Sequence, residues 1–345
     1  DFFCDLVVRK RTVAMNTYKS IEYGGVRAEL SRFAQGGATE THVMLHVTDG
    51  MMTYEEQLKA LNEAFEHVRR EECCGSNAIF RRLFVSDMAN QRALITEMLS
   101  DRQDCAVSIV EQPPLDGTKV ALWVWFVEGA TTRQLENDLY EVRHGAYRHL
   151  FGARQHRHAT GSYEQTRRLL SDYADQLREE GLSLKTGCVR TWFFVQNVDV
   201  NYAGLVKARN EVFADNGLTT KTHFIASTGI GGRHNDHRVC VLMDTYAVDG
   251  LKEGQVGYLK ASTHLNPTAE YGVAFERGAY IDYADRRHVL ISGTASIDNK
   301  GNVVYPGDIR RQMARMVDNV QALLSEGGCV WSDVQHMIVY LRDIS

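Results

Sequence analysis

One order of structural signals occurs three times along the chain at nearly constant spacing. Each occurrence begins with a residue type that caps helices and closes at the end of an apolar, strand-like run. The three pairs of positions are Thr53 and Asp87, Ser162 and Asn197, and Asp308 and Asp343. Their members lie 34, 35 and 35 residues apart. A period kept this closely indicates an internal repeat, which constrains the whole fold because each copy must form the same unit.

The first two copies contain the same series of expected elements. Strands are expected at 41–47, 80–87, 105–110 and 120–127 in the first copy and at 140–150, 189–195, 222–226 and 238–248 in the second. Capping boxes at Thr53–Glu56 and Ser162–Gln165 each open an apolar helical stripe. Second helices are expected over 89–99 and 200–214. The pattern is typical of an α+β domain.

The third copy starts near Tyr271. Apolar runs at 288–291 and 303–305, separated by a Gly/Asn turn, predict a β-hairpin whose first strand stops at Ser292-Gly293-Thr294. Asp308 is the expected N-cap of a helix that Gly327-Gly328 ends, and a strand follows at 334–341. Since the first copy continues 40 residues from Asp87 to Val127, we expect the natural protein to extend roughly as far beyond Asp343.

Four segments of the third copy resemble, in order and spacing, the RidA/YjgF family, whose members hydrolyse reactive enamines and imines and carry the older label endoribonuclease L-PSP. The segments are 292–294, 307–312, 318–320 and 339–343. The resemblance implies a small mixed sheet with two helices on one face (the chorismate mutase-like fold), usually assembled as a trimer with sites in clefts between subunits. Together with the repeat, it predicts an α+β chain of tandem RidA-like domains arranged as an intramolecular pseudo-trimer. The expected boundaries are an extension at 1–20 and domains at 21–130, 131–250 and 251–345, the last incomplete at its C-terminus.

Bulk composition narrows the class of protein. Hydrophobic residues make up 44% of the chain and charged residues 24%, with a net charge of −5. This balance lacks the basic footprint of a nucleic-acid-binding protein, and no apolar run approaches the ~20 residues of a membrane span. Seven cysteines without CxxC spacing are typical of a reducing compartment. We therefore expect a cytoplasmic protein with no nucleic-acid or membrane partner, either a monomeric pseudo-trimer or a low-order homo-oligomer.

The catalytic residues of the RidA family do not transfer to the first two copies. In the family, an arginine on the fifth strand holds the substrate carboxylate and a glutamate on the last strand positions a water. These positions fall near Val107 and over 120–125 in the first copy, and at 225–228 and 239–243 in the second. Neither copy keeps the pair, so the catalytic residues stay unassigned and the arginine is expected in the missing part of the third copy.

A second resemblance, to the RidA-related chorismatases, supplies candidate binding residues. These enzymes hydrolyse chorismate in an Arg-rich cleft, and the similar segments are 190–194, Tyr202 with Arg209, 226–230, 271–277 and 293–297. Both resemblances imply a carboxylate-bearing small molecule, held by hydroxyl groups and by backbone amides around Gly229 and Gly293. The predicted substrate-binding residues are Arg190, Ser227, Thr228, Gly229, Phe275, Arg277, Ser292, Gly293 and Thr294.

Structural interpretations compete with several of these assignments. Both 227–229 and 292–294 have the composition of turns, Arg190 could pair with a structural carboxylate, and Arg277 could be a surface residue. Histidines 144, 149, 156 and 158 have no carboxylate or cysteine at metal-ligand spacing, and His156 and His158 alternate as exposed strand residues do. We expect neither a metal nor another cofactor.

The sequence thus predicts a hydrolase of a small carboxylate metabolite, of the 2-imino or 2-enamino acid deaminase type, acting in an inter-domain cleft. The alternatives are chorismatase-like hydrolysis and a non-catalytic ligand-binding or regulatory protein, since a fold does not fix a function.

Overall fold

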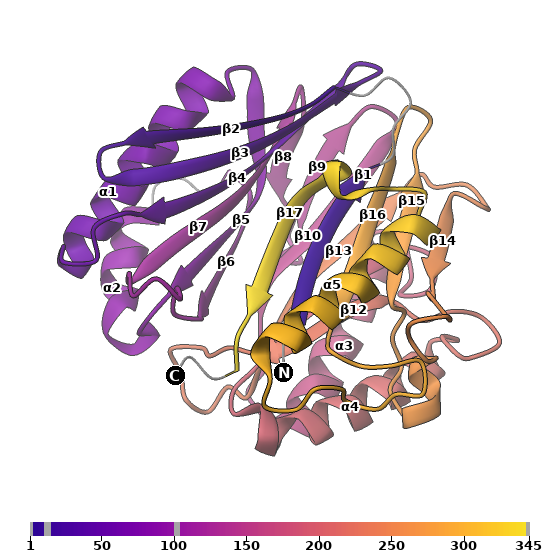
Figure 1. Cartoon of the computed structure of the whole chain (residues 1–345). Helices are drawn as coiled ribbons and strands as arrows, with labels where there is room; N and C mark the ends of the chain where they lie inside the picture. Colours follow the sequence, from indigo (N-terminus) through magenta and orange to yellow (C-terminus); the bar gives the residue numbers. More distant parts are fainter. Residues whose placement is uncertain (1–2, 10–14, 100–103, 343–345) are drawn as a thin grey trace.

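The computed structural model describes residues 3–9, 15–99 and 104–342 and consists of three sheets packed together, each with helices on one side (Figure 1). The first sheet has the order β2 (Met15–Tyr23), β3 (Val26–Gln35), β4 (Ala38–Val47), β7 (Val120–Glu128), β5 (Ser76–Val85) and β6 (Ala106–Glu111). The second has the order β8 (Thr131–Gln134), β9 (Tyr140–His144), β10 (Tyr147–Gln155), β13 (Val241–Asp249), β11 (Cys188–Val195) and β12 (Ala226–Gly231). The third has the order β14 (Val256–Leu259), β15 (Gly278–Asp282), β16 (Arg287–Thr294), β1 (Phe3–Arg9) and β17 (Val334–Tyr340).

The three sheets share one topology. A meander of three strands is followed by a strand antiparallel to its last member, and then by the strands that the helices connect. In the third sheet, β1 from the start of the chain lies where β7 and β13 lie in the other two. The predicted α+β class and the tandem repetition are confirmed.

The helices cover the outer faces of the sheets. They are α1 (Tyr54–His67), which continues as the π-helical turn η1 (Val68–Glu72), α2 (Met88–Leu99), α3 (Gly161–Glu179), α4 (Val198–Asp215) and α5 (Ile309–Glu326), with short 3-10 turns η2 (Thr268–Tyr271) and η3 (Trp331–Asp333). In Figure 1, α1 and α2 lie on the outer side of the first sheet and α5 lies along the third. Each helical layer has its own apolar core with its sheet.

A fourth apolar cluster joins the inner faces of all three sheets. It contains Phe80 and Trp125 of the first sheet, Trp192 and Tyr246 of the second, and Leu290 of the third. Trp123, Trp125 and Trp192 all pack in the core, since each is at most 3% exposed. Burying a large apolar side chain contributes roughly 1.5–3 kcal/mol, so this cluster holds the three sheets in place.

Two of the three predicted helix caps form. Thr53 and Glu56 make both bonds of the capping box, and the Asp308 carboxylate accepts from the Arg311 amide at 3.0 Å. The prediction for Ser162 is wrong, because α3 begins at Gly161 and Ser162 lies inside its first turn. There the serine packs against α4, and a Cβ added at Gly204 would lie 2.3 Å from its Oγ.

Several expected strands differ from the observed ones. The strand expected at 222–226 is β12, which begins only at Ala226 and extends to Gly231 because it pairs in parallel with β11. The expected strand 140–150 is the hairpin of β9 and β10, and β10 ends before His156 and His158, which are therefore not strand residues.

The hairpin expected in the third copy is also wrong. Ser292-Gly293-Thr294 do not stop the strand but complete β16. The two neighbours of β16 are β15 and β1, so no strand edge remains for residues 303–305. They make only an isolated bridge, between Ile297 and Val303.

Candidate functional site

The contact between β12 of the second sheet and β16 of the third, which we call the second seam, is made by hydroxyl groups. The Ser227 amide donates to Ser292 Oγ at 2.9 Å, and the Gly293 amide donates to Thr228 Oγ1 at 3.0 Å. Ser292 Oγ in turn donates to the carbonyl of Glu276 at 2.6 Å. Small hydroxyl side chains therefore replace the apolar contacts that would normally join two packed sheets.

Three buried arginines converge on this seam from different elements. Arg190 lies on β11, Arg209 on α4 and Arg277 just before β15, and they are 0%, 1% and 5% exposed. Arg190 Nη2 donates to Thr228 Oγ1 at 2.5 Å, and Arg209 Nη1 donates to Ser227 Oγ at 3.5 Å. The guanidinium groups therefore donate to the side chain of Thr228, which also accepts from Gly293 of the third sheet, and to that of Ser227, whose amide bonds Ser292.

Arg209 and Arg277 make no ion pair with any described residue. Arg277 Nη2 donates to the carbonyl and side-chain oxygens of Asn266 at 3.0 and 3.1 Å. Arg209 Nε and Nη2 have no hydrogen-bond partner among the described residues. Burial is the main cause that lowers the pKa of both guanidinium groups, and the phenols of Tyr202 and Tyr271 oppose it. Buried cations without carboxylates are costly, which favours an anion as their partner.

Aromatic rings cover the arginines on the side toward solvent. The Phe275 ring lies between two of them, 5.7 Å from Arg209 Cζ and 5.4 Å from Arg277 Cζ. Tyr271 lies 5.5 Å from Arg277 Cζ and is 45% exposed, while Tyr202 and Phe275 are half-buried. The seam can thus offer both cations and flat apolar surfaces to a ligand.

The seam needs glycine at position 229. A Cβ added to Gly229 would lie 2.8 Å from Cε2 of Tyr202, closer than real Cβ contacts allow. The side chain of Asn210 fixes the other side of the site by bonding both the Gly272 carbonyl, at 2.6 Å, and the Ala274 amide, at 3.0 Å. Helix α4 therefore positions Tyr202 and Arg209 and also ties down the segment that carries Phe275.

All nine predicted binding residues lie in or beside the second seam, although their roles differ from those expected. The turn interpretations are wrong, because 227–229 belong to β12 and 292–294 to β16. The interpretation of Arg277 as a surface residue is wrong as well. The Gly293 amide already donates to Thr228, and the Thr294 hydroxyl donates to the Ser292 carbonyl at 2.9 Å, so these groups build the seam. Arg190, Arg209 and Arg277 are the groups suited to bind an anion.

Arg209 and Glu276 were not among the predicted binding residues. Arg209 lies on the apolar face of α4, four residues after Leu205 and three before Val212, and a charge inside an apolar stripe was the available signal. Glu276 lies between Phe275 and Arg277, and its Oε1 accepts from the Phe224 amide at 2.9 Å. It ties the third domain to the second and is a half-buried carboxylate next to the site.

The described ranges show neither a metal centre nor a membrane-spanning helix. No group of three or more His, Cys, Asp or Glu residues in these ranges is arranged to hold a metal ion. Among the histidines considered above, the His156 ring lies tilted against the His234 ring, with centroids 4.4 Å apart, and His149 bonds the Tyr246 hydroxyl at 2.8 Å. Within the same ranges, no helix has both the length and the hydropathy to span a bilayer.

Comparisons with known proteins agree with this architecture. Residues 273–345 match the family model Endoribonuclease L-PSP. The chain is 30% identical over 79 residues to a RutC family protein of Pyrococcus abyssi, covering 23% of this chain and 56% of the relative. It is 36% identical over 56 residues to a RutC family protein of Saccharolobus solfataricus, covering 16% and 44%. The chain thus spans about half the length of the curated relatives it matches.

One solved structure covers more of the chain. The crystal structure of a chorismatase superposes with a TM-score of 0.53 at 18% identity and covers 72% of each chain. At this identity the likeness shows the fold, which is a tandem arrangement of RidA-like domains.

Proposed function

We infer that residues 273–345, which match the Endoribonuclease L-PSP family model, and the second domain together form a hydrolase site for a small carboxylate-bearing metabolite. The three domains would then correspond to the three subunits of a RidA trimer, and the seam between two sheets would correspond to the cleft between subunits. The single observation that carries this proposal is the set of three buried arginines at the second seam.

The charge of the site defines the ligand. Arg209 and Arg277 flank Phe275 and make no ion pair within the described ranges, so a ligand can bring the compensating carboxylates. An arginine holds a carboxylate through two parallel N–H···O bonds, each stronger than a bond between neutral groups. Two such cations beside a flat ring favour a cyclic, unsaturated acid with two acidic groups over a three-carbon imino acid.

We therefore place chorismate-type hydrolysis first and 2-imino acid deamination second. The preference rests on the number of arginines and on the rings of Tyr202, Tyr271 and Phe275. In either reaction the guanidinium groups would stabilise negative charge that develops on the substrate, at a place already shielded from water. A bound water would be the nucleophile, and Glu276, next to Arg277 in sequence, is a candidate carboxylate to position it.

A turnover assay on the purified chain tests the proposal. Chorismate and freshly generated 2-iminopropionate are followed separately, with the wild type and with Arg209→Met. Loss of one substrate that requires Arg209 supports the proposal and identifies the reaction. Arg178→Met, on an exposed arginine of α3, is the control and keeps wild-type turnover.

If neither substrate is consumed, the hydrolase proposal fails. Calorimetry with chorismate then distinguishes a binding protein, in which affinity still depends on Arg209, from a site that takes no dicarboxylate.

A further inference from the structure

We propose that the junction of the first two domains holds a second, separate ligand site, for a phosphate dianion, either free or as a phosphate monoester. The site consists of two arginines and two histidines, Arg92, Arg154, His156 and His234. They come from three segments, which are helix α2 of the first domain, the end of β10 with the residue after it, and the loop after β12. The proposal does not depend on the function of the second seam.

Arg154 is held in a strained backbone conformation, and its side chain keeps a free donor. Its φ of 52° is uncommon for residues other than glycine. Its amide donates to Asp244 Oδ1 at 2.8 Å, and Arg82 fixes that buried carboxylate at 2.9 Å. The Nε of Arg154 is buried without a hydrogen-bond partner among the described residues. Strain of this kind persists where the neighbours impose it, and it is common at ligand sites.

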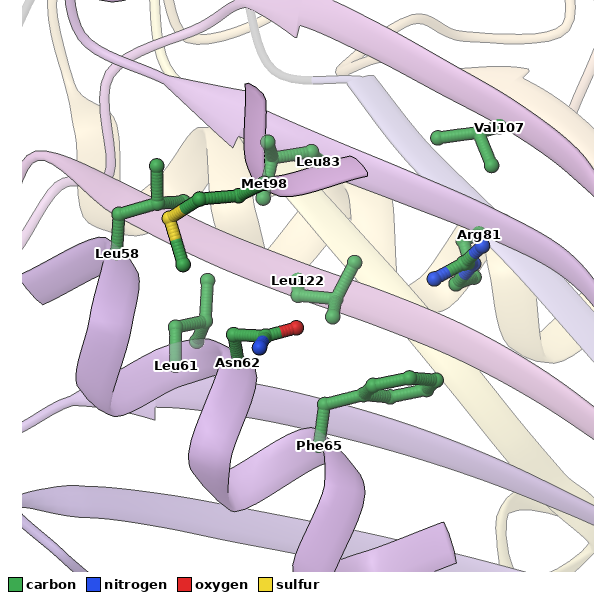
Figure 2. A pocket seen from close by; sticks show the side chains of 9 residues that line it. All are labelled: Leu58, Leu61, Asn62, Phe65, Arg81, Leu83, Met98, Val107 and Leu122. Atoms are coloured by element: carbon green, nitrogen blue, oxygen red, sulfur yellow. The ribbon is translucent and has the colours of Figure 1, made fainter. Parts of the chain in front are cut away.

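Helix α2 brings a second arginine to the same place. The inner face of α2 packs on the first sheet, where Met98 lies in an apolar recess beside Leu58 of α1 (Figure 2). Arg92, six residues before Met98, is exposed. Its Nη1 donates to the side-chain oxygen of Asn235 at 2.7 Å when that amide is oriented to satisfy both of its polar atoms. Arg92 therefore reaches from the first domain to the loop after β12 in the second.

Two imidazole rings complete the site. His156 directly follows β10 and His234 lies in the loop after β12, with ring centroids 4.4 Å apart. The Asp236 amide donates to His234 Nδ1 at 3.1 Å, so the neutral ring carries its proton on Nε2 and can donate it in a hydrogen bond. Burial, followed by the charges of His156, Arg154 and Arg92, lowers the pKa of His234 to about 4. Both arginines therefore lie near this ring, and a bound anion would offset their repulsion.

The acids around these groups are already paired. Asp236 accepts from Arg238 through both oxygens, at 3.0 and 2.7 Å, and Asp244 is paired inside the core. Neither Arg92 nor Arg154 makes an ion pair with a residue that the structure describes. Two positive charges are thus left without a counter-ion. They suit one doubly charged group with several acceptor oxygens better than a single carboxylate.

The fold does not require an arginine at this position of the helix. Arg92 lies five residues after Asp87, and Tyr202 lies five residues after Asn197. The repeat therefore places Tyr202, which packs on Gly229 at the second seam, at the position that Arg92 has in the first domain. One position of the second helix thus carries an aromatic ring in one copy and a cation in the other.

Calorimetric titration of the full chain with inorganic phosphate, glycerol 3-phosphate and acetate tests the proposal. We expect saturable binding of phosphate or of its ester, and the tighter of the two shows which form the site takes. Acetate should bind at least about tenfold more weakly, because its single charge cannot pair with both arginines. Absence of saturable binding of both phosphate ligands, or equal binding of acetate, overturns the proposal.

Two variants locate the site. Arg154→Met should lower the affinity for the tighter phosphate ligand about tenfold or more, since charge-assisted bonds are lost. Arg92→Met should do the same from an exposed helix position, even if Arg154→Met does not fold. The control Arg178→Met, on an exposed arginine of α3, keeps wild-type affinity.

A third variant separates this site from the second seam. Arg209→Met should bind the phosphate ligand like the wild type. Binding that is unaffected by both Arg92→Met and Arg154→Met, or that is lost in Arg209→Met, overturns the assignment.

Discussion

One contact joins the first two sheets through β6 and β10, and another joins the last two through β12 and β16. The two contacts have the same backbone arrangement but differ in their side chains. We call them the first and second seams. Each contains a parallel ladder of six pairs, from Phe80 with Ala106 and from Arg190 with Ala226, and in each a bulge immediately precedes the first pair. The match places Phe80 where the second seam has Arg190. One seam is thus a core, and the other is the candidate site.

The contact between the first two sheets is mainly an aromatic core, which one buried ion pair, Arg82 with Asp244, also crosses. Phe80 lies 5.3 Å from Trp123, 5.6 Å from Phe151 and 6.4 Å from Trp192, and Ile109 takes the position of Gly229. In the second seam, buried guanidinium and hydroxyl groups take the place of such apolar contacts. They add little to the free energy of folding. Sites of this kind are commonly retained for function at some cost in stability.

The largest expected effect is the loss of stability in Phe80→Ala. Removing a fully buried phenylalanine should cost about 3–5 kcal/mol of unfolding free energy, through lost burial and a residual cavity. Urea unfolding measures this cost, and Arg190→Met is the matched variant. Arg190→Met removes a buried charge but also takes a donor from the carbonyls of Thr191 and Ile291, so it should cost less, about 1–3 kcal/mol. A cost for Arg190→Met as large as that for Phe80→Ala would contradict the division of roles.

The second prediction concerns the variant Arg190→Phe, which places in the second seam the residue type that the first seam has at the matching position, Phe80. Arg190→Phe should lower kcat/KM for the substrate of the protein by about 100-fold or more, as loss of a preorganised donor does. The chain should still fold, which circular dichroism and the urea midpoint check. The exposed variant Arg178→Met keeps full activity. An active Arg190→Phe enzyme would mean that Arg190 is only a structural residue.

A smaller effect is expected at the hydroxyl groups. Thr228 Oγ1 accepts from both the Gly293 amide and Arg190, so Thr228→Val takes the acceptor from the buried Gly293 amide and one acceptor from Arg190. We expect a loss of about 1–3 kcal/mol in unfolding free energy and a raised KM. The counterpart in the first seam is Ser108, and Ser108→Ala should change stability by less than about 1 kcal/mol. Equal effects of the two substitutions would show that Thr228 has no special part in holding the seam.

The comparison also shows what could be predicted from the sequence. Local signals were sufficient for the caps at Thr53 and Asp308, because the bonds join residues three positions apart. The repeat followed from the spacing of such signals. The strand over 292–294 was not predictable in this way, since its hydroxyl and glycine residues extend the strand only because a neighbouring sheet meets them.

The candidate site was predictable as a set of segments but not as an arrangement. Arg190 and Arg277 are 87 residues apart in sequence, and only the packing of the second sheet on the third brings their elements together. Arg209 was named only through the chorismatase resemblance and not as a binding residue, because it lies on the buried face of α4, where a pattern of apolar residues predicts core. Composition cannot distinguish a buried arginine that binds a ligand from one that holds the fold.

The last prediction concerns a polar cluster that Glu40 of the first sheet, His149 of the second and His288 of the third line together. His149 of β10 bonds the Tyr246 hydroxyl, and burial, with His288 and Arg286 nearby, lowers its pKa to about 3. The unfolded chain binds a proton there near pH 6.5, so it holds more protons than the folded chain between pH 3 and 6.5. Unfolding free energy should therefore fall as the pH is lowered through this window, by at most about 1.4 kcal/mol per pH unit from this group. Urea midpoints measured from pH 7 to 4 should show a shallower slope in His149→Gln, and an unchanged slope would assign the acid sensitivity to other groups.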